Sequence, residues 1–318
     1  DDWTSMIKWT KARDGSWKFD YTAFDTWVKF MMQEVGIRDQ ISCYTMIPWT
    51  MKIAYIDEAS GNKQEIQLDP GNSSFEETWG AFLKDFTKHL KTRGILNKTC
   101  IALDERPDNL TKAACNVLEK YAPDLKIVSA NNHPSGMSDF VYDVSPIFQH
   151  SGGDIPALAK KRTAEGRFTT FYVCCGPEKP NTFTYSPPAE SHWIGLYAAA
   201  NNFSGFLRWA YNSWNENPFA TTSFGTWPDG DAFLVYPGNM SSVRWEAMCN
   251  GFEDYEKIVM LRSAAEKSTK ASFKEAVKVL DDYLSATFTV NNGLNGSEHG
   301  AHVKRVLELI NAAADNSL

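Results

Sequence analysis

Between residues 20 and 265, short apolar runs alternate with longer segments in which apolar residues recur at helical spacing. Such alternation indicates repeated strand–helix units, and strands that are separated by helices usually pair in parallel. Parallel strands are covered by helices, so they are apolar along their whole length rather than at every second residue. The pattern therefore predicts an α/β fold built on a parallel sheet.

The apolar runs predict six parallel strands, over residues 40–48, 98–105, 125–132, 139–145, 167–175 and 205–214. The helices between them have clear ends; "SSFEETWGAFLKDFTKHLKTRG" opens with serines followed by glutamates and closes with a glycine. The first twenty residues are predicted to form a loop. Six strands suit a doubly wound sheet, whereas a (β/α)8 barrel needs two more.

Composition limits the classes of partner. The net charge of -7 argues against a nucleic-acid partner, because nucleic-acid binders gather Lys and Arg on one face. No apolar stretch reaches the roughly 18 residues of a membrane span. Aromatic residues make up 13% of the chain, with 11 tryptophans, and such rings form flat platforms for sugars as well as filling cores.

No metal or cofactor site is predicted. The cysteines include no C-x-x-C pair, and several lie in apolar runs where a thiol behaves as a small hydrophobe, as we expect for Cys174 and Cys175. The six histidines are scattered along the chain.

Polar and aromatic residues follow the predicted strands, and active sites of parallel α/β folds lie at the carboxyl ends of strands. The candidates are Tyr44, Asp104, Glu105, His133, Tyr172, Trp209, Tyr211, Asn212, Trp214 and Asp231.

Asp104 and Glu105 end the apolar run "TCIAL", directly before Arg106 and Pro107. Two interpretations are open: the acids cap the following helix or pair with Arg106, or they are catalytic. Most glycosidases take carboxylates roughly 5 to 9 Å apart from different strands, so neighbouring acids suit the substrate-assisted exception better. There one carboxylate orients the sugar's 2-acetamido group, and the other protonates the glycosidic oxygen. The aromatic stretch "LRWAYNSWNENP" favours this second interpretation.

The chain resembles the catalytic domain of glycoside hydrolase family 123, the β-N-acetylgalactosaminidases, along residues 5 to 262. The resemblance rests on "SMIKWTKARDGSWKFDYTAFDTWVKFM", "CYTMIPW", "IALDERPD", "TTFYVCCGPEKPNTFTYSPPAE", "LRWAYNSWNENPF" and "DGDAFLVYPGNMSSVRWEAMCNGFEDYEKI". It implies retaining, substrate-assisted removal of terminal β-linked N-acetylgalactosamine from a glycan or glycolipid, with the family's catalytic Asp–Glu pair on Asp104 and Glu105. The alternatives are a β-N-acetylglucosaminidase with the same mechanism and a non-catalytic glycan-binding protein.

The resemblance also implies a (β/α)8 barrel that lacks its first strands in this chain. We expect this catalytic barrel over residues 1–265 and packed C-terminal helices over 266–318. A missing N-terminal segment or a partner chain would then cover the exposed strand edges. Family members are typically exported by bacteria, so a periplasmic or extracellular location is expected.

The remaining candidates are assigned to substrate binding or to packing. Tyr172 is expected either to bond the acetamido carbonyl or to pack between strand and helix, and His133 either to contact a hydroxyl or to stabilise its loop. Trp209 and Trp214 are expected to stack on the apolar face of the sugar, the alternative being a role in the core alone. Asp231 is expected either to bind hydroxyls or to hold a turn.

Overall fold

The computed structural model describes residues 5–131 and 141–317, which form two compact units. The first unit contains the described residues up to Tyr142, and the second runs from Asp143 to the end of the described chain. The expected division at residue 265, between a catalytic part and C-terminal helices, stays a prediction.

Three parallel strands run through the first unit: β3 (Ile41–Tyr44), β6 (Thr99–Leu103) and β7 (Lys126–Asn131). All five residues of β6, the middle strand, are buried, as expected where both faces are covered. Tyr44 pairs with Ala102, and Leu103 pairs with Ser129. The carboxyl ends of the three strands therefore meet at one edge of the sheet.

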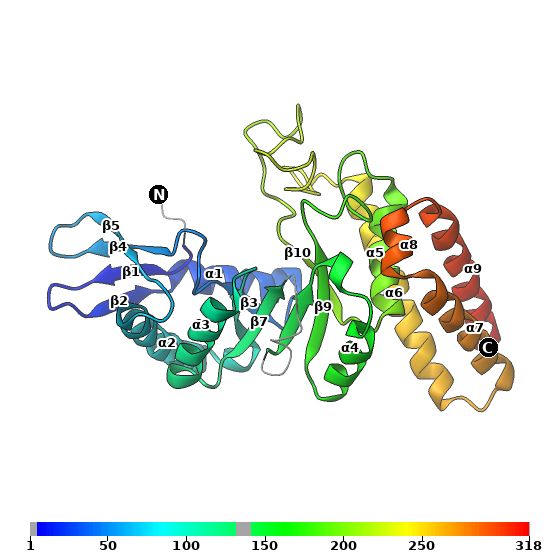
Figure 1. Cartoon of the computed structure of the whole chain (residues 1–318), viewed down its shortest axis with the longest axis horizontal. Helices are drawn as coiled ribbons and strands as arrows, with labels where there is room; N and C mark the ends of the chain where they lie inside the picture. Colours follow the sequence, from blue (N-terminus) through cyan, green and yellow to red (C-terminus); the bar gives the residue numbers. More distant parts are fainter. Residues whose placement is uncertain (1–4, 132–140, 318) are drawn as a thin grey trace. The chain divides into compact units, whose positions relative to one another are not determined.

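Two long helices flank β6 in the chain. α2 (Ser73–Arg93) ends at Gly94, whose φ of 69° is in the left-handed region that favours glycine. α3 (Asp108–Tyr121) starts four residues after Asp104 and leads to β7. Figure 1 shows α2 and α3 beside the strands of this unit.

A separate four-stranded sheet replaces the loop expected at the start of the chain. Its order is β2-β1-β4-β5, with two antiparallel hairpins joined by a parallel β1–β4 pair (Figure 1). The ring of Trp9, on β1, is stacked 4.8 Å from that of Phe82 on α2. Buried aromatic residues thus attach the sheet to α2. The strands are β1 (Lys8–Lys11), β2 (Trp17–Asp20), β4 (Lys52–Asp57) and β5 (Lys63–Gln67).

The first unit also has α1 (Thr22–Phe30), which continues as a π-helical turn over Met31–Val35, and a 3-10 turn over Leu96–Lys98. α1 buries Phe24 and Val28 in the core of this unit. Its outer face carries Trp27 and Phe30, whose rings are 5.8 Å apart and more than 40% exposed.

The second unit contains three further parallel strands, which pair in the order β8-β9-β10. They are β8 (Asp143–Pro146), β9 (Phe168–Val173) and β10 (Gly205–Arg208). A 3-10 turn over Phe148–His150 and α4 (Ile155–Ala164) connect the first two strands.

Helices make up most of the rest of this unit. They are α5 (Pro188–Ala200), α6 (Val243–Lys267), α7 (Ala271–Thr287), α8 (Val290–Asn295) and α9 (His299–Ser317). α5 is the central one, and its residues from Trp193 to Ala199 are all buried. Figure 1 shows α6, α7 and α9 around α5.

Two glycines allow α5 and α6 to cross closely. A Cβ atom added at Gly195 would lie 2.2 Å from the carbonyl carbon of Gly251, and one added at Gly251 would lie 2.4 Å from the carbonyl oxygen of His192. Any side chain at either position would collide with backbone. The crossing holds α5, which lies between β9 and β10 in the chain.

The predicted (β/α)8 barrel is wrong. The described residues contain six parallel strands, three in each unit, at the places that the apolar runs indicate, and β3 and β10 are each paired on one side only. The other four strands form the mixed sheet. Apolar periodicity identifies single strands, whereas barrel closure depends on their tilt and stagger. That a further segment or chain covers the open edges stays a prediction.

Candidate active site

Asp104 and Glu105 directly follow β6, in the four-residue link to α3. Both side chains are partly exposed, whereas the strand residues before them are buried. Pro107 occupies the N-cap position of α3 and supplies no side-chain hydrogen bond to this helix. The pair lies at the carboxyl edge of the first unit's parallel strands.

The carboxylate of Asp104 has a defined partner. The indole Nε1 of Trp49 donates a hydrogen bond to Oδ2 of Asp104 at 2.8 Å. Trp49 lies in the segment between β3 and β4, 55 residues from Asp104 in the chain, and is 67% exposed. Trp49 is not predictable as a partner of Asp104, because no local sequence pattern connects residues 55 positions apart.

Arg106 fixes the position of Trp49. Its guanidinium carbon lies 4.0 Å from the centroid of the Trp49 ring, a cation–π distance. Its Nε donates to the carbonyl of Ile47 at 3.1 Å, and Nη2 donates to the carbonyl of Pro48. Arg106 is 9% exposed. The guanidinium thus contacts the backbone and the ring of the 47–49 segment.

Tyr44 lies at the same edge of the sheet as the acidic pair. It is the last residue of β3 and pairs with Ala102, two residues before Asp104. Its side chain is 53% exposed. Three of the predicted site residues thus lie at the carboxyl edge of the first unit's parallel strands: Tyr44, Asp104 and Glu105.

The other described candidates belong to the second unit. Tyr172, on β9, is 3% exposed, which agrees with its packing interpretation. Trp209, Tyr211 and Trp214 follow β10 and are 42%, 39% and 41% exposed. Asn212, between them, is exposed and pairs with Phe233 in an isolated antiparallel bridge. His133 lies outside the described residues.

Three of these aromatic side chains are oriented by contacts within the second unit. The indole nitrogen of Trp214 donates to the carbonyl of Val235 at 2.8 Å. The ring of Tyr211 stacks on Trp245 at 5.9 Å, and that of Trp209 lies 5.8 Å from Trp227. The segment after β10 therefore presents ordered, partly exposed rings.

Asp231 is fully buried. Its Oδ1 accepts a hydrogen bond from Nη2 of Arg208 at 2.7 Å, and its Oδ2 accepts one from Nε1 of Trp209 at 3.0 Å. Burial lowers the pKa of Arg208, and the charge of Asp231 opposes that shift. The carboxylate is thus used inside the protein to pair Arg208 and orient Trp209.

Cys174 and Cys175 follow β9 with their sulfur atoms 3.8 Å apart and are not joined by a disulfide. Cys174 is half-buried and Cys175 is exposed. The described residues contain no group of three or more His, Cys, Asp or Glu side chains arranged to hold a metal ion. They also contain no helix that is long and apolar enough to cross a membrane.

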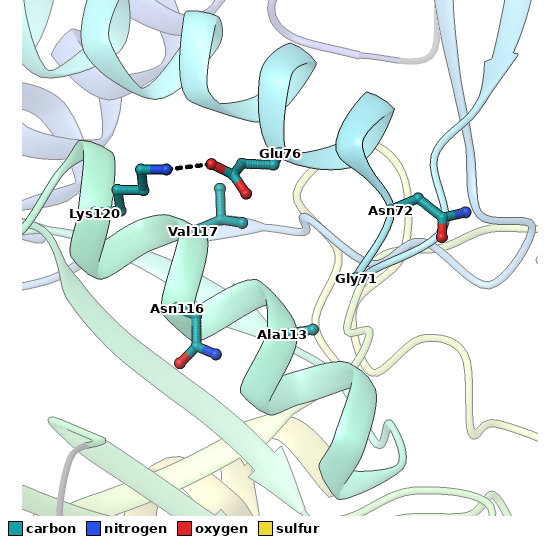
Figure 2. Close-up of a pocket in the computed structure, with 7 residues that line it drawn as sticks. All are labelled: Gly71, Asn72, Glu76, Ala113, Asn116, Val117 and Lys120. Atoms are coloured by element: carbon teal, nitrogen blue, oxygen red, sulfur yellow. Dashed lines mark hydrogen bonds and ion pairs between the residues drawn. The ribbon is translucent and has the colours of Figure 1, made fainter.

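A hollow of about 200 Å³ lies elsewhere in the first unit, between the start of α2 and α3 (Figure 2). Glu76 and Lys120 form an ion pair across it, and the Tyr121 hydroxyl also bonds Glu76. None of the predicted site residues lines this hollow. Its charged groups satisfy one another, so it offers no catalytic arrangement.

Comparisons with known proteins agree with the resemblance. A structure described as a family 123 glycoside hydrolase from Clostridium perfringens, in work on glycolipid glycan hydrolysis, aligns with a TM-score of 0.85 and 28% identity. The alignment covers 98% of this chain and 58% of that one, so this chain spans well under two thirds of its relative. No curated protein matches. Residues 2–261 match the family model for the glycoside hydrolase 123 catalytic domain, and the chain therefore belongs to this family.

Proposed function

We propose that this protein is a glycosidase that removes terminal β-linked N-acetylgalactosamine with retention of configuration. The observation that carries the proposal is the adjacent pair Asp104 and Glu105 at the carboxyl end of β6, where both side chains are partly exposed. Adjacent carboxylates suit a reaction in which the nucleophile belongs to the substrate, because no second strand then has to supply one.

In the first step, the carbonyl oxygen of the 2-acetamido group attacks the anomeric carbon. Glu105 gives its proton to the departing glycosidic oxygen, and the bond to the leaving group breaks. The charged carboxylate of Asp104 accepts a hydrogen bond from the acetamido N–H. It thereby stabilises the positive charge that develops on the resulting oxazoline ring. This division requires Glu105 to be protonated and Asp104 to be ionised when the substrate binds.

In the second step, Glu105 acts as a base. It takes a proton from water, which attacks the anomeric carbon from the face that the leaving group left and reopens the ring. Two inversions give net retention. The products are N-acetylgalactosamine and a shortened glycan, and Glu105 regains its proton.

The remaining site residues are assigned to substrate binding. Trp209 and Trp214 are proposed to stack on the apolar face of a sugar, as partly exposed, ordered rings do. Hydroxyl and amide groups of Tyr44, Tyr211 and Asn212 are proposed to bind sugar hydroxyls. Tyr172 and His133 stay candidates for acetamido and hydroxyl contacts. Asp231 acts through Trp209 rather than by touching the sugar.

The Clostridium perfringens relative is described in connection with glycolipid glycans. We propose the same substrate class for this chain. Export from the producing cell, which the family resemblance implies, also stays a proposal.

The experiment is hydrolysis of the 4-nitrophenyl β-glycosides of N-acetylgalactosamine and N-acetylglucosamine, with and without a thiazoline analogue of the oxazoline intermediate. The proposal expects preference for the galacto substrate and competitive inhibition by the thiazoline. Preference for the gluco substrate would change the sugar and keep the mechanism. No cleavage of either substrate, together with measurable glycan binding, would favour a non-catalytic lectin-like protein.

A further inference from the structure

We infer that Trp49 is a positioning residue for Asp104, and that Arg106 keeps Trp49 in place. The inference rests on the proposed function, because it concerns how Asp104 meets the 2-acetamido group. It assigns a role to a tryptophan that is 67% exposed and separated from Asp104 by 55 residues of chain.

The contact determines which oxygen of Asp104 is available. Trp49 Nε1 donates to Oδ2 at 2.8 Å, and the residues that the structure describes supply no further hydrogen bond to this carboxylate. An indole N–H can only donate, so Oδ2 must accept. Rotation of the carboxylate would break this bond. Oδ1 therefore remains for the acetamido N–H of the sugar, in a fixed orientation.

Trp49 is itself anchored from two sides. The guanidinium carbon of Arg106 lies 4.0 Å from the centroid of the Trp49 ring, and the guanidinium donates to the carbonyls of Ile47 and Pro48, the two residues before Trp49. Met46 and Ile47 are each 1% exposed, so the start of this segment is fixed in the core. The anchoring explains how a largely exposed indole keeps one orientation.

The two residues that contact Trp49 are close together in the sequence. Asp104 and Arg106 are two residues apart, and both contact Trp49, one through its N–H and the other through its ring. The segment after β6 therefore supplies both Asp104 and Arg106, the residue that holds the hydrogen-bond donor Trp49 in place. Glu105, between them, carries the separate acid–base role.

Two simpler roles for Trp49, packing and sugar stacking, do not account for both its exposure and its hydrogen bond to Asp104. A tryptophan that served only as packing would be buried, and Trp49 is among the most exposed aromatic residues described. One that served only as a sugar platform would need no hydrogen bond to the carboxylate. The bond gains strength when a sugar excludes water from it, because charge-assisted hydrogen bonds are stronger in a low dielectric.

The test uses two changes that remove the N–H group: Trp49→Phe, and replacement of Trp49 by 3-benzothienylalanine, which has the same shape with sulfur in place of N–H. The matched control is Trp27→Phe, since Trp27 is also an exposed tryptophan of the first unit, on α1. Thermal unfolding of all variants reports whether they fold alike.

We expect both Trp49 variants to lose about 10- to 100-fold in kcat/KM, the usual effect of losing a hydrogen bond to a charged group. The loss should be equal for activated aryl and unactivated alkyl glycosides, because Trp49 acts on the acetamido side and not on the leaving group. Thiazoline inhibition should weaken in parallel. Trp27→Phe should match the wild type.

A readout without turnover completes the test. In 15N-tryptophan spectra, Asp104→Ala should shift the Trp49 indole resonance and leave that of Trp27 unmoved. Wild-type activity together with unchanged kinetics in both Trp49 variants, or an unmoved Trp49 resonance, overturns the inference alone. A wild-type protein that cleaves neither nitrophenyl glycoside instead overturns the proposed function, so the two failures are distinguishable.

Discussion

The indole nitrogen of Trp209 lies 3.0 Å from Oδ2 of Asp231, a carboxylate with no exposed surface. The other oxygen of this carboxylate pairs with the guanidinium of Arg208, whose side chain is 6% exposed. One buried acid thus neutralises a buried cation and orients an exposed ring.

Removing this acid should destabilise the second unit. Asp231→Ala leaves Arg208 charged and unpaired in the interior, which costs about 3–5 kcal/mol. The free energy of unfolding, measured in urea, should fall by that amount. The double variant Arg208→Met with Asp231→Leu should lose less, because it removes both charges. Equal stability of Asp231→Ala and wild type would contradict the pairing.

The crossing of α5 and α6 makes a second prediction about stability. Gly195→Ala would place a methyl group 2.2 Å from the carbonyl carbon of Gly251, and we expect a loss of about 3 kcal/mol in the free energy of unfolding. The control is Gly300→Ala in α9, where the added Cβ finds its nearest neighbour at 3.9 Å. This control should gain up to about 1 kcal/mol from the higher helix propensity of alanine. A Gly195→Ala protein as stable as the control would show that the helices separate easily.

His299 should make the protein sensitive to acid. It is 3% exposed and packs 4.4 Å from the ring of Trp193, and burial lowers its pKa from 6.5 to about 4. The unfolded chain therefore binds a proton at higher pH than the folded one. Neutral His299 therefore leaves the free energy of unfolding undiminished above about pH 6.5. As the pH falls toward 4, the free energy of unfolding should decrease by about 3 kcal/mol at most.

This dependence is measurable as the difference between wild type and His299→Gln in urea unfolding from pH 7 to pH 4. The wild type should lose more stability over this interval than the variant. His150→Gln, which changes an exposed histidine of the same unit, should follow the wild type. Parallel curves for wild type and His299→Gln would exclude this source of acid sensitivity.

Glu105→Gln should affect substrates according to their leaving groups. An alkyl or sugar leaving group needs a proton as it departs, so its rate should fall about 10²- to 10⁴-fold. A 4-nitrophenolate leaves without a proton and should lose far less in the first step. The ratio of kcat/KM for the two substrate types measures this. Equal losses on both would remove Glu105 from the acid role.

The strand that carries the acidic pair is predictable from local sequence. "TCIAL" contains no charged residue and is buried throughout, as is typical of a middle strand, and the charged residues begin where β6 ends. The N-terminal sheet is not predictable in this way. β1 and β2 have four residues each and include lysines, and their strand character depends on Trp9 packing against α2.

The candidate site likewise has parts that local sequence indicates and parts that depend on tertiary packing. Asp104 and Glu105 stand out because unusual residues follow a recognisable strand. The bond from Trp49 to Asp104 and the pairing of Arg208 with Asp231 join residues 55 and 23 positions apart. Such contacts arise from tertiary packing, so no spacing rule indicates them.

The most direct measurement of the central claim varies the nucleophile inside the substrate. Aryl β-N-acetylgalactosaminides with one, two or three fluorine atoms on the acetamido methyl group have progressively less nucleophilic carbonyl oxygens. If that oxygen attacks the anomeric carbon with the help of Asp104, kcat/KM should fall steeply with each fluorine. Rates that do not change across the series would show that the acetamido group takes no part, and would contradict the mechanism assigned to Asp104 and Glu105.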